Sequence, residues 1–156
     1  MSGLEDLYRE IILDHYRTPR NRGELDPPAT KVDGHNPLCG DEITVYLAVE
    51  GVGDDAVVSD IKIGGQGCSI SQSSASMMTL AVTGKPVSEI EAVTRRFKTM
   101  MGVDGIELLD GDDALDLGEL EALQGVVKFP VRIKCAVLSW NTLADAISEA
   151  LDPTAD

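Results

Sequence analysis

The chain has 156 residues, which is enough for one domain with its own hydrophobic core, and we expect residues 1–156 to form a single domain. Its 27 acidic residues outnumber its 13 lysines and arginines and give a formal net charge of −14. A surface this acidic repels nucleic acids and anionic membranes, which excludes both as partners, whereas a basic patch on another protein suits it.

Three further features indicate the compartment. No apolar run is long enough to span a bilayer, and the acidic, amphipathic N-terminus does not have the pattern of a signal peptide. The chain has 3 cysteines, an odd number at wide spacing, which argues against a secreted disulfide framework. We therefore expect a cytoplasmic protein.

The first predicted element is a helix that ends before Pro19, because apolar residues from Leu4 to Ile12 recur at helical spacing. His15 lies on the same face, where a packed structural histidine is more common than a metal ligand. An irregular connection with a local basic cluster follows over residues 17–31.

A small sheet is expected next. Residues 41–50 alternate between apolar and polar side chains, as a half-buried strand does, and residues 57–63 return as the second strand of a hairpin. Residues 31–35 are a candidate edge strand. The glycine-rich turn at residues 64–67 lacks the Gly-Lys-Ser/Thr ending of a phosphate loop. We expect it to place Cys68 at the N-terminus of a helix, where a thiolate is favoured.

Helices dominate the second half of the chain. Apolar spacing predicts helices over residues 69–82 and 87–101, a short helix over 117–123 and a long final helix over 131–151. The acidic tract from Asp104 to Glu121 is expected to be a solvated loop rather than a site. Cys135 falls in the first two turns of the final helix.

Three cysteines and one aspartate form a candidate metal site. Cys39 and Asp41 are two residues apart on an extended segment, so their side chains point the same way, and Cys68 and Cys135 each lie near a helix start. Three thiols and a carboxylate suit a soft or borderline divalent metal, zinc above all. The alternative is three unrelated buried thiols. The absence of a C-x-x-C pair favours that alternative, and the placement of all three at element ends favours a site.

Four long motifs resemble one known family. They are L-Y-R-E-I-I-L-D-H-Y-R-T-P-R-N from residue 7, N-P-x-C-G-D from residue 36, G-x-G-C-S-I-S-x-x-S-A-S-M-M from residue 65 and K-F-P-x-R-I-K-C-A-x-L-S-W from residue 128. In these motifs the chain is similar to the SufU branch of the U-type iron–sulfur cluster assembly proteins. The resemblance implies an α+β fold of the SufE/NifU-like (IscU-like) type, with a small antiparallel three-stranded sheet packed against helices. It also implies that Cys39, Asp41, Cys68 and Cys135 bind Zn²⁺.

The same resemblance implies a function. SufU-like proteins are zinc-dependent sulfurtransferases that accept persulfide sulfur from a SufS-type cysteine desulfurase, a pyridoxal-phosphate enzyme, and Cys39 matches their acceptor cysteine. A SufBCD-type scaffold is a candidate downstream partner. The alternative is a scaffold of the IscU type, on which the same ligands hold a nascent iron–sulfur cluster transiently, with Cys135 as the rival acceptor. A structural zinc module without transfer activity is a third hypothesis.

Features around the third cysteine favour the SufU branch. Lys134 stands where IscU-type proteins carry a histidine, and residues 101–124 resemble the SufU insertion. Lys128 to Arg132 replaces the scaffold motif L-P-P-V-K, which argues against a dedicated Hsp70 partner. Three thiolates and one carboxylate around Zn²⁺ sum to about −2, so Arg132 and Lys134 are expected to offset negative charge. Arg132 either also meets the partner enzyme or remains a solvated cation.

Overall fold

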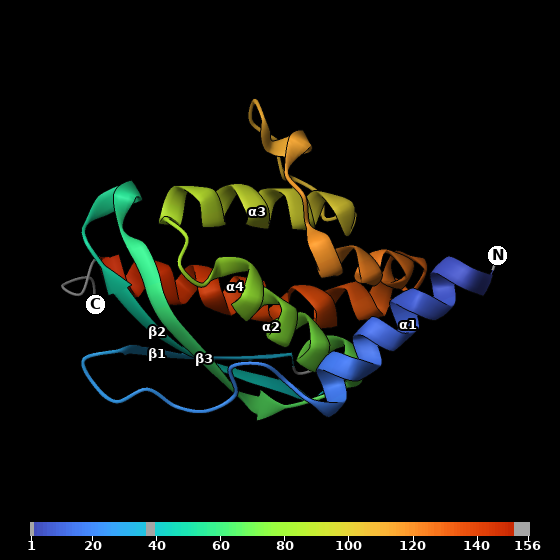
Figure 1. Cartoon of the computed structure of the whole chain (residues 1–156), viewed down its shortest axis with the longest axis horizontal. Coiled ribbons are helices and arrows are strands. Elements are labelled where there is room, and N and C mark those ends of the chain that lie inside the picture. Colours follow the sequence, from blue (N-terminus) through green and yellow to red (C-terminus); the bar gives the residue numbers. More distant parts are fainter. Residues whose placement is uncertain (1, 37–39, 152–156) are drawn as a thin grey trace.

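The computed structural model describes residues 2–36 and 40–151 (Figure 1). The helices are α1 (Ser2–Arg17), α2 (Ser69–Val82), α3 (Val87–Met100) and α4 (Pro130–Leu151), the strands are β1 (Thr30–Asn36), β2 (Asp41–Glu50) and β3 (Val57–Gln66), and the short 3-10 helices are η1 (Gly53–Asp55), η2 (Asp112–Ala114) and η3 (Gly118–Lys128). One sheet packed with helices confirms the predicted α+β class. Among the described residues, no helix is both long and apolar enough to cross a membrane.

The sheet has the strand order β1-β2-β3, and both neighbouring pairs are antiparallel. Val45 in β2 is opposite Val32 of β1 and Ile63 of β3. On β2 the odd-numbered residues from Ile43 to Leu47 are at most 1% exposed, while the residues between them are half-buried. The sheet therefore buries one face, as the alternation in the sequence predicts.

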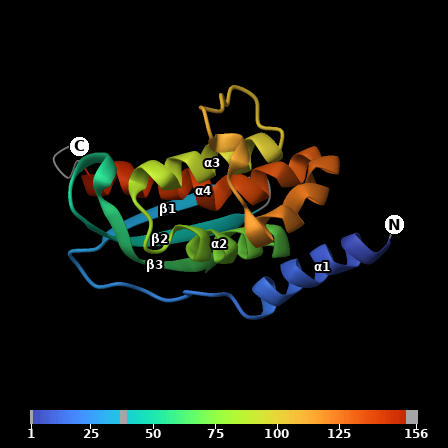
Figure 2. The same cartoon turned by 45° about the horizontal axis from the view of Figure 1, so that its top comes forward.

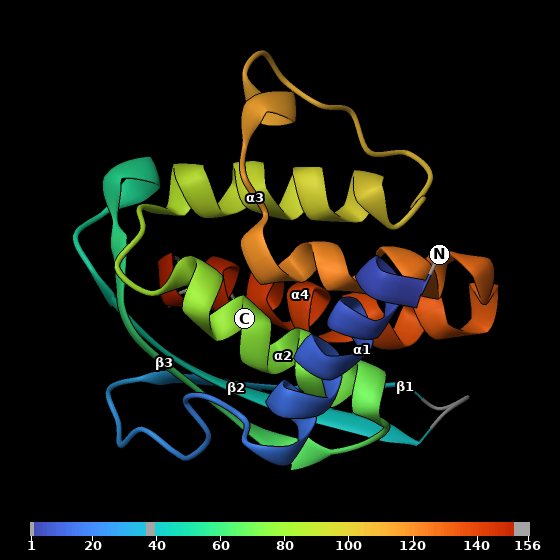
Figure 3. The same ribbon diagram turned by 45° about the vertical axis from the view of Figure 1, so that its right-hand side comes forward.

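Helices cover that face in two layers. Helices α2 and α4 pack against the sheet and against each other, α4 on β1 and β2 and α2 on β3 (Figure 2). Helix α3 lies on the far side of α4, where Phe97 stacks on Trp140 with ring centroids 4.9 Å apart. Helix α1 packs on α2 and on η3 (Figure 3).

The close approach of α4 to β1 requires glycine at position 34. A Cβ atom on Gly34 would lie 2.1 Å from Thr142 Oγ1 of α4, far inside van der Waals contact. The missing side chain lets α4 lie directly on the edge strand. Gly34 thereby determines how closely α4, the helix that carries Cys135, approaches the sheet.

Strand β3 is longer than predicted. It continues through Gly64, Gly65 and Gln66, whose backbones pair with residues 42–44 of β2. Ladder hydrogen bonds join backbone groups and need no side chain, so glycines did not end the strand. The predicted glycine-rich turn is therefore wrong over residues 64–66, and only Gly67 separates the strand from Cys68.

The short helix predicted over residues 117–123 is also longer, because η3 spans residues 118–128. Three of its four buried residues, Leu120, Leu123 and Val126, recur every three residues, which is the period of a 3-10 helix. The period extends the apolar face to the start of α4, beyond the segment that a search for helical spacing of 3.6 residues detects.

The acidic tract is mostly exposed, as predicted, but Asp112 is an exception. Its side chain is 6% exposed, and its Oδ2 accepts hydrogen bonds from Arg95 Nε of α3 at 2.7 Å and from the backbone N–H of Leu109 at 2.9 Å. The hydrogen bond from Arg95, with that from Leu109, holds the pKa of Asp112 below its ordinary value. The ion pair between Asp112 and Arg95 therefore joins the acidic segment that precedes η3 to α3.

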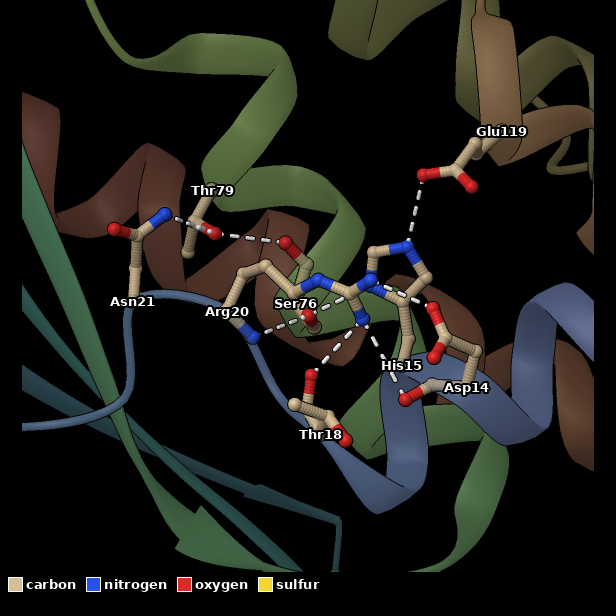
Figure 4. Close-up of polar contacts among 8 residues, drawn as sticks. All are labelled: Asp14, His15, Thr18, Arg20, Asn21, Ser76, Thr79 and Glu119. Atoms are coloured by element: carbon tan, nitrogen blue, oxygen red, sulfur yellow. Dashed lines mark hydrogen bonds and ion pairs between the residues drawn. The ribbon is translucent and has the colours of Figure 1, made fainter.

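His15 has the structural role expected from its place on the apolar face of α1. It is fully buried, and its Nδ1 and Nε2 atoms lie 2.7 Å from Ser76 Oγ and 2.9 Å from Glu119 Oε1 (Figure 4). Ser76 Oγ also accepts the backbone N–H of Arg20 at 2.8 Å, so we assign its own hydrogen to His15 Nδ1 and the Nε2–H to Glu119. His15 thus joins α1 to α2 and to η3.

Candidate metal centre

The site begins where β3 ends. Cys68 is the N-cap residue of α2, with an extended backbone (φ −71°, ψ 169°), and the backbone N–H of Ser71 donates to Cys68 Sγ at 3.5 Å. The free N–H groups and the dipole at a helix N-terminus favour negative charge, so this position suits a metal ligand that carries one. The predicted placement of Cys68 at a helix start is confirmed.

Asp41, the first residue of β2, supplies a carboxylate. It is fully buried, its Oδ1 accepts the backbone N–H of Cys68 at 2.9 Å, and its Oδ2 lies 3.9 Å from Cys68 Sγ. The two oxygens therefore have different roles, because Oδ1 fixes the start of α2 while Oδ2 faces the thiol. A buried carboxylate is costly unless hydrogen bonds and a cation compensate its charge, and a metal ion at Oδ2 would supply that cation.

The backbone at Gly67 passes very close to this carboxylate. A Cβ atom at Gly67 would lie 2.5 Å from Asp41 Oδ1 and 2.6 Å from Ser71 Oγ. Ser71 Oγ in turn donates to the carbonyl oxygen of Cys68 at 3.2 Å. Only glycine leaves room for Asp41 to reach the Cys68 N–H, so Gly67 belongs to the construction of the site.

Cys135 brings a third ligand from the second turn of α4, where it is fully buried. One ligand atom each from Asp41, Cys68 and Cys135 lie within 4.8 Å of one another. Tetrahedral zinc holds its sulfur ligands about 3.8 Å apart, so shifts of about 1 Å bring these atoms to zinc spacing. Two thiols and a carboxylate fit zinc and leave a fourth position for a ligand. Cys39, the predicted fourth ligand, lies outside the described residues.

The two predicted cations near the site differ in their contacts. Arg132, in the first turn of α4, lies beside Cys135 and Cys68, and these two cysteines raise the pKa of its guanidinium. Lys134 is exposed and takes part in no hydrogen bond or ion pair with another described residue. Arg132 is thus placed to offset thiolate charge, whereas Lys134 faces solvent.

A groove of about 1120 Å³ opens beside Cys68. No local pattern in the sequence indicates this groove, because its walls come from α1, α2, η3 and the start of α4, which are far apart in the chain. Phe129 and Val131, on either side of Pro130, are 62% and 63% exposed, and they form an apolar pair at the groove. The lining includes Tyr8, Ile12, Ile70, Val126, Phe129 and Val131, with the cations Arg9, Lys128 and Arg132.

Comparisons with known proteins agree with this architecture. The family model described as NifU-like N terminal domain matches residues 7–136. The chain is 46% identical to the zinc-dependent sulfurtransferase SufU of Bacillus subtilis, with 95% of this chain and 94% of that protein covered. It is 41% identical to the iron–sulfur cluster assembly scaffold protein IscU of Streptococcus pyogenes, with coverages of 96% and 88%.

A solved structure extends the likeness to three dimensions. The crystal structure of a SUF-system protein of Fervidobacterium islandicum, named as an iron–sulfur cluster assembly scaffold, superposes with a TM-score of 0.74 at 32% identity and covers 88% of this chain and 94% of that one. The family match and these relatives span most of the chain, and the resemblance of its motifs is thereby confirmed. The chain belongs to the NifU-like N-terminal domain family of iron–sulfur cluster assembly proteins.

Proposed function

We propose that this chain is a cytoplasmic zinc-dependent sulfurtransferase that accepts persulfide sulfur from a SufS-type cysteine desulfurase for iron–sulfur cluster assembly. The observation that carries the proposal is the convergence of Asp41, Cys68 and Cys135, whose ligand atoms lie within 4.8 Å of one another. The function named for the Bacillus subtilis relative supports sulfur transfer over a purely structural zinc module.

Zinc would be held by Asp41, Cys68 and Cys135, with Cys39 as the proposed fourth ligand. When bound, zinc keeps its cysteine ligands deprotonated and, being redox-inert, does not oxidise them. The chain contributes the orientation of the ligands. The Cys68 N–H fixes one oxygen of Asp41, and Arg132 lies beside Cys135, where its charge would offset part of the thiolate charge.

Cys39 is the proposed sulfur acceptor. Its thiolate attacks the outer sulfur of the persulfide on the desulfurase, a new S–S bond forms to Cys39, the S–S bond of the donor breaks, and the donor cysteine leaves as a thiolate. Sulfur is transferred without an external oxidant or reductant. In the sequence Cys39 stands two residues before Asp41, one of the clustered ligands.

The groove beside Cys68 is the proposed approach for the desulfurase. The partner must bring its persulfide to a site whose ligands are largely buried, and the groove gives direct access to Cys68. Exposed Phe129 and Val131 offer apolar contact to the partner, while the groove cations Arg9 and Lys128 pair with Asp6 and Glu5 of α1 at 3.9 Å each. A SufBCD-type scaffold is the proposed recipient downstream.

A scaffold function is the second candidate, because several relatives are named as IscU scaffold proteins. On that hypothesis the same ligands hold an iron–sulfur cluster during assembly. Anaerobic reconstitution with iron and sulfide distinguishes the two. A labile cluster fits the sulfurtransferase, whereas a stable cluster that is transferred to an acceptor protein favours the scaffold.

The decisive experiment is desulfurase turnover. A purified SufS-type desulfurase is given cysteine with increasing amounts of this protein, and alanine formation is measured. We expect turnover to rise and saturate, and Phe129→Ser to raise the half-saturating concentration about tenfold. Leu109→Ser is the matched control, since Leu109 is 57% exposed but does not line the groove. Turnover that the parent protein leaves unchanged would contradict the proposed function.

A further inference from the structure

Helix α2 is buried along most of its length, and its serines make different kinds of contact. Every residue from Ser71 to Thr79 is buried. Ser73 Oγ donates to Ile70 O of its own helix at 3.2 Å, and Ser76 Oγ bonds to His15 of α1. Ser74 Oγ instead donates to Ala136 O of α4 at 2.6 Å. Neighbouring serines of similar burial therefore differ in whether they join two helices.

The Ser74–Ala136 bond joins the two helices that carry thiol ligands. Cys68 is the N-cap of α2, and Ser74 lies about 9 Å further along that helix. On α4, Ala136 directly follows Cys135, so the bonded carbonyl is adjacent to the ligand residue. Ser74 and Ala136 are both 0% exposed, which keeps water from competing for the bond.

A bond of this kind fixes the relative position of two helices more sharply than small side chains do. Serine and alanine have no long side chains to interlock across an interface, so packing alone resists sliding of one helix along the other only weakly. The distance between a hydroxyl and a carbonyl oxygen is confined to a few tenths of an ångström. Sliding α4 against α2 changes the separation of Cys68 Sγ and Cys135 Sγ, and the bond opposes that movement.

We infer that Ser74 is a positioning residue of the metal centre, whose bond to Ala136 sets the spacing between the Cys68 and Cys135 thiolates. The inference rests on the proposed function, because it presumes that these thiolates bind zinc. Removing the Ser74 hydroxyl leaves no buried polar group without a hydrogen-bond partner. In an α-helix the carbonyl of Ala136 also accepts the backbone N–H four residues later, so Ser74→Ala loosens the register between the helices and leaves each helix intact.

The experiment compares Ser74→Ala with Ser73→Ala. Ser73 is adjacent and also 0% exposed, but its hydroxyl bonds only within α2, which makes it the matched control. The zinc dissociation constant is measured by competition with a chromophoric chelator, and the visible absorption of the Co²⁺-substituted protein reports the coordination geometry. We expect Ser74→Ala to bind zinc about tenfold more weakly, as for other residues that orient ligands, and to alter the Co²⁺ bands. Ser73→Ala should match the parent protein in both.

Circular dichroism and the melting temperature of the metal-free proteins complete the test. Parent-like zinc affinity and Co²⁺ bands in Ser74→Ala would overturn the inference, and so would equal losses in both variants. A Ser74→Ala chain that does not fold without metal would show that the bond supports the whole fold, which also overturns a role at the metal centre. Failure of the parent itself to bind zinc is a separate result, which would contradict the proposed metal centre and every inference built on it.

Discussion

His15 and Glu119 are 104 residues apart in the chain and are joined by a hydrogen bond of 2.9 Å between His15 Nε2 and Glu119 Oε1. The histidine is fully buried, whereas the glutamate side chain is 51% exposed. Together with the bond from His15 to Ser76, this contact ties α1 to both of the elements on which it packs.

We therefore expect His15→Ala to lower the free energy of unfolding by about 2–4 kcal/mol, because it leaves a cavity and removes the partner of the buried Ser76 hydroxyl. Its zinc content should remain that of the parent protein, since His15 is not among the clustered ligands. Urea unfolding and metal analysis provide the two measurements. Glu119→Gln keeps the acceptor oxygen and should change stability by less than about 0.5 kcal/mol. Loss of zinc with unchanged stability in His15→Ala would contradict the structural role.

Asp41 Oδ1 accepts the Cys68 N–H, whereas Oδ2 faces the Cys68 thiol. Two substitutions of Asp41 should therefore have different outcomes. Asp41→Asn retains an oxygen that can accept the Cys68 N–H but loses the negative charge, so the metal-free melting temperature should be kept while zinc affinity falls about 10–100-fold. Asp41→Ala removes both functions. It should also lower the stability of the metal-free protein by about 1–3 kcal/mol, because the Cys68 N–H loses its partner. Equal metal-free stability of the two variants would show that the hydrogen bond at Oδ1 does not matter.

Gly67→Ala should damage the metal centre without changing any ligand. The added methyl group would lie 2.5 Å from Asp41 Oδ1, so the carboxylate must move, and we expect zinc affinity to fall at least about tenfold. Gly125→Ala is the control, since a Cβ atom there meets no other atom within 4 Å. Chelator competition measures both. A Gly67→Ala protein with the parent's affinity would show that the site tolerates displacement of Asp41.

The location of transferred sulfur tests the role of Cys39. After incubation with a desulfurase and cysteine, the protein is alkylated, digested and analysed by peptide mass spectrometry. We expect the additional sulfur on Cys39, because Cys68 is held by a helix N-terminus and Cys135 by Arg132, whereas transfer needs a thiolate that is free to attack. Cys39→Ala should abolish the modified peptide. Sulfur found on Cys135 in the parent protein would reverse the assignment.

Local patterns in the sequence predict the elements of this fold better than the contacts between them. The spacing of apolar residues predicts α4 to within a residue, and the glycine before Cys68 indicates its place at a helix start. The continuation of β3 through Gly64 and Gly65 depends on pairing with β2, which no local pattern encodes. The bond between His15 and Glu119 joins distant segments and involves a half-exposed carboxylate, so it left no signal in hydrophobic periodicity.

In the candidate site, too, local patterns predict the residues better than the contacts between them. Residue type and position at element ends made Asp41, Cys68 and Cys135 candidates, but spacing alone could not distinguish a shared site from separate buried thiols. Asp41 and Cys68 are 27 residues apart and are joined by a side-chain to backbone bond that only the folded chain reveals. The family motifs predicted the convergence, and the ligand atoms of these three residues do lie together. Gly67 was part of a recognised motif, but its clearance from the Asp41 carboxylate is a property of the three-dimensional structure.

Two acids of the segment that resembles the SufU insertion bond to basic side chains of the surrounding fold. Asp112 pairs with Arg95 of α3, and Glu119 accepts from His15 of α1. Excising residues 101–124 would leave Arg95 and the buried His15 without these partners. Excision would therefore remove contacts to α1 and α3 as well as shorten the chain.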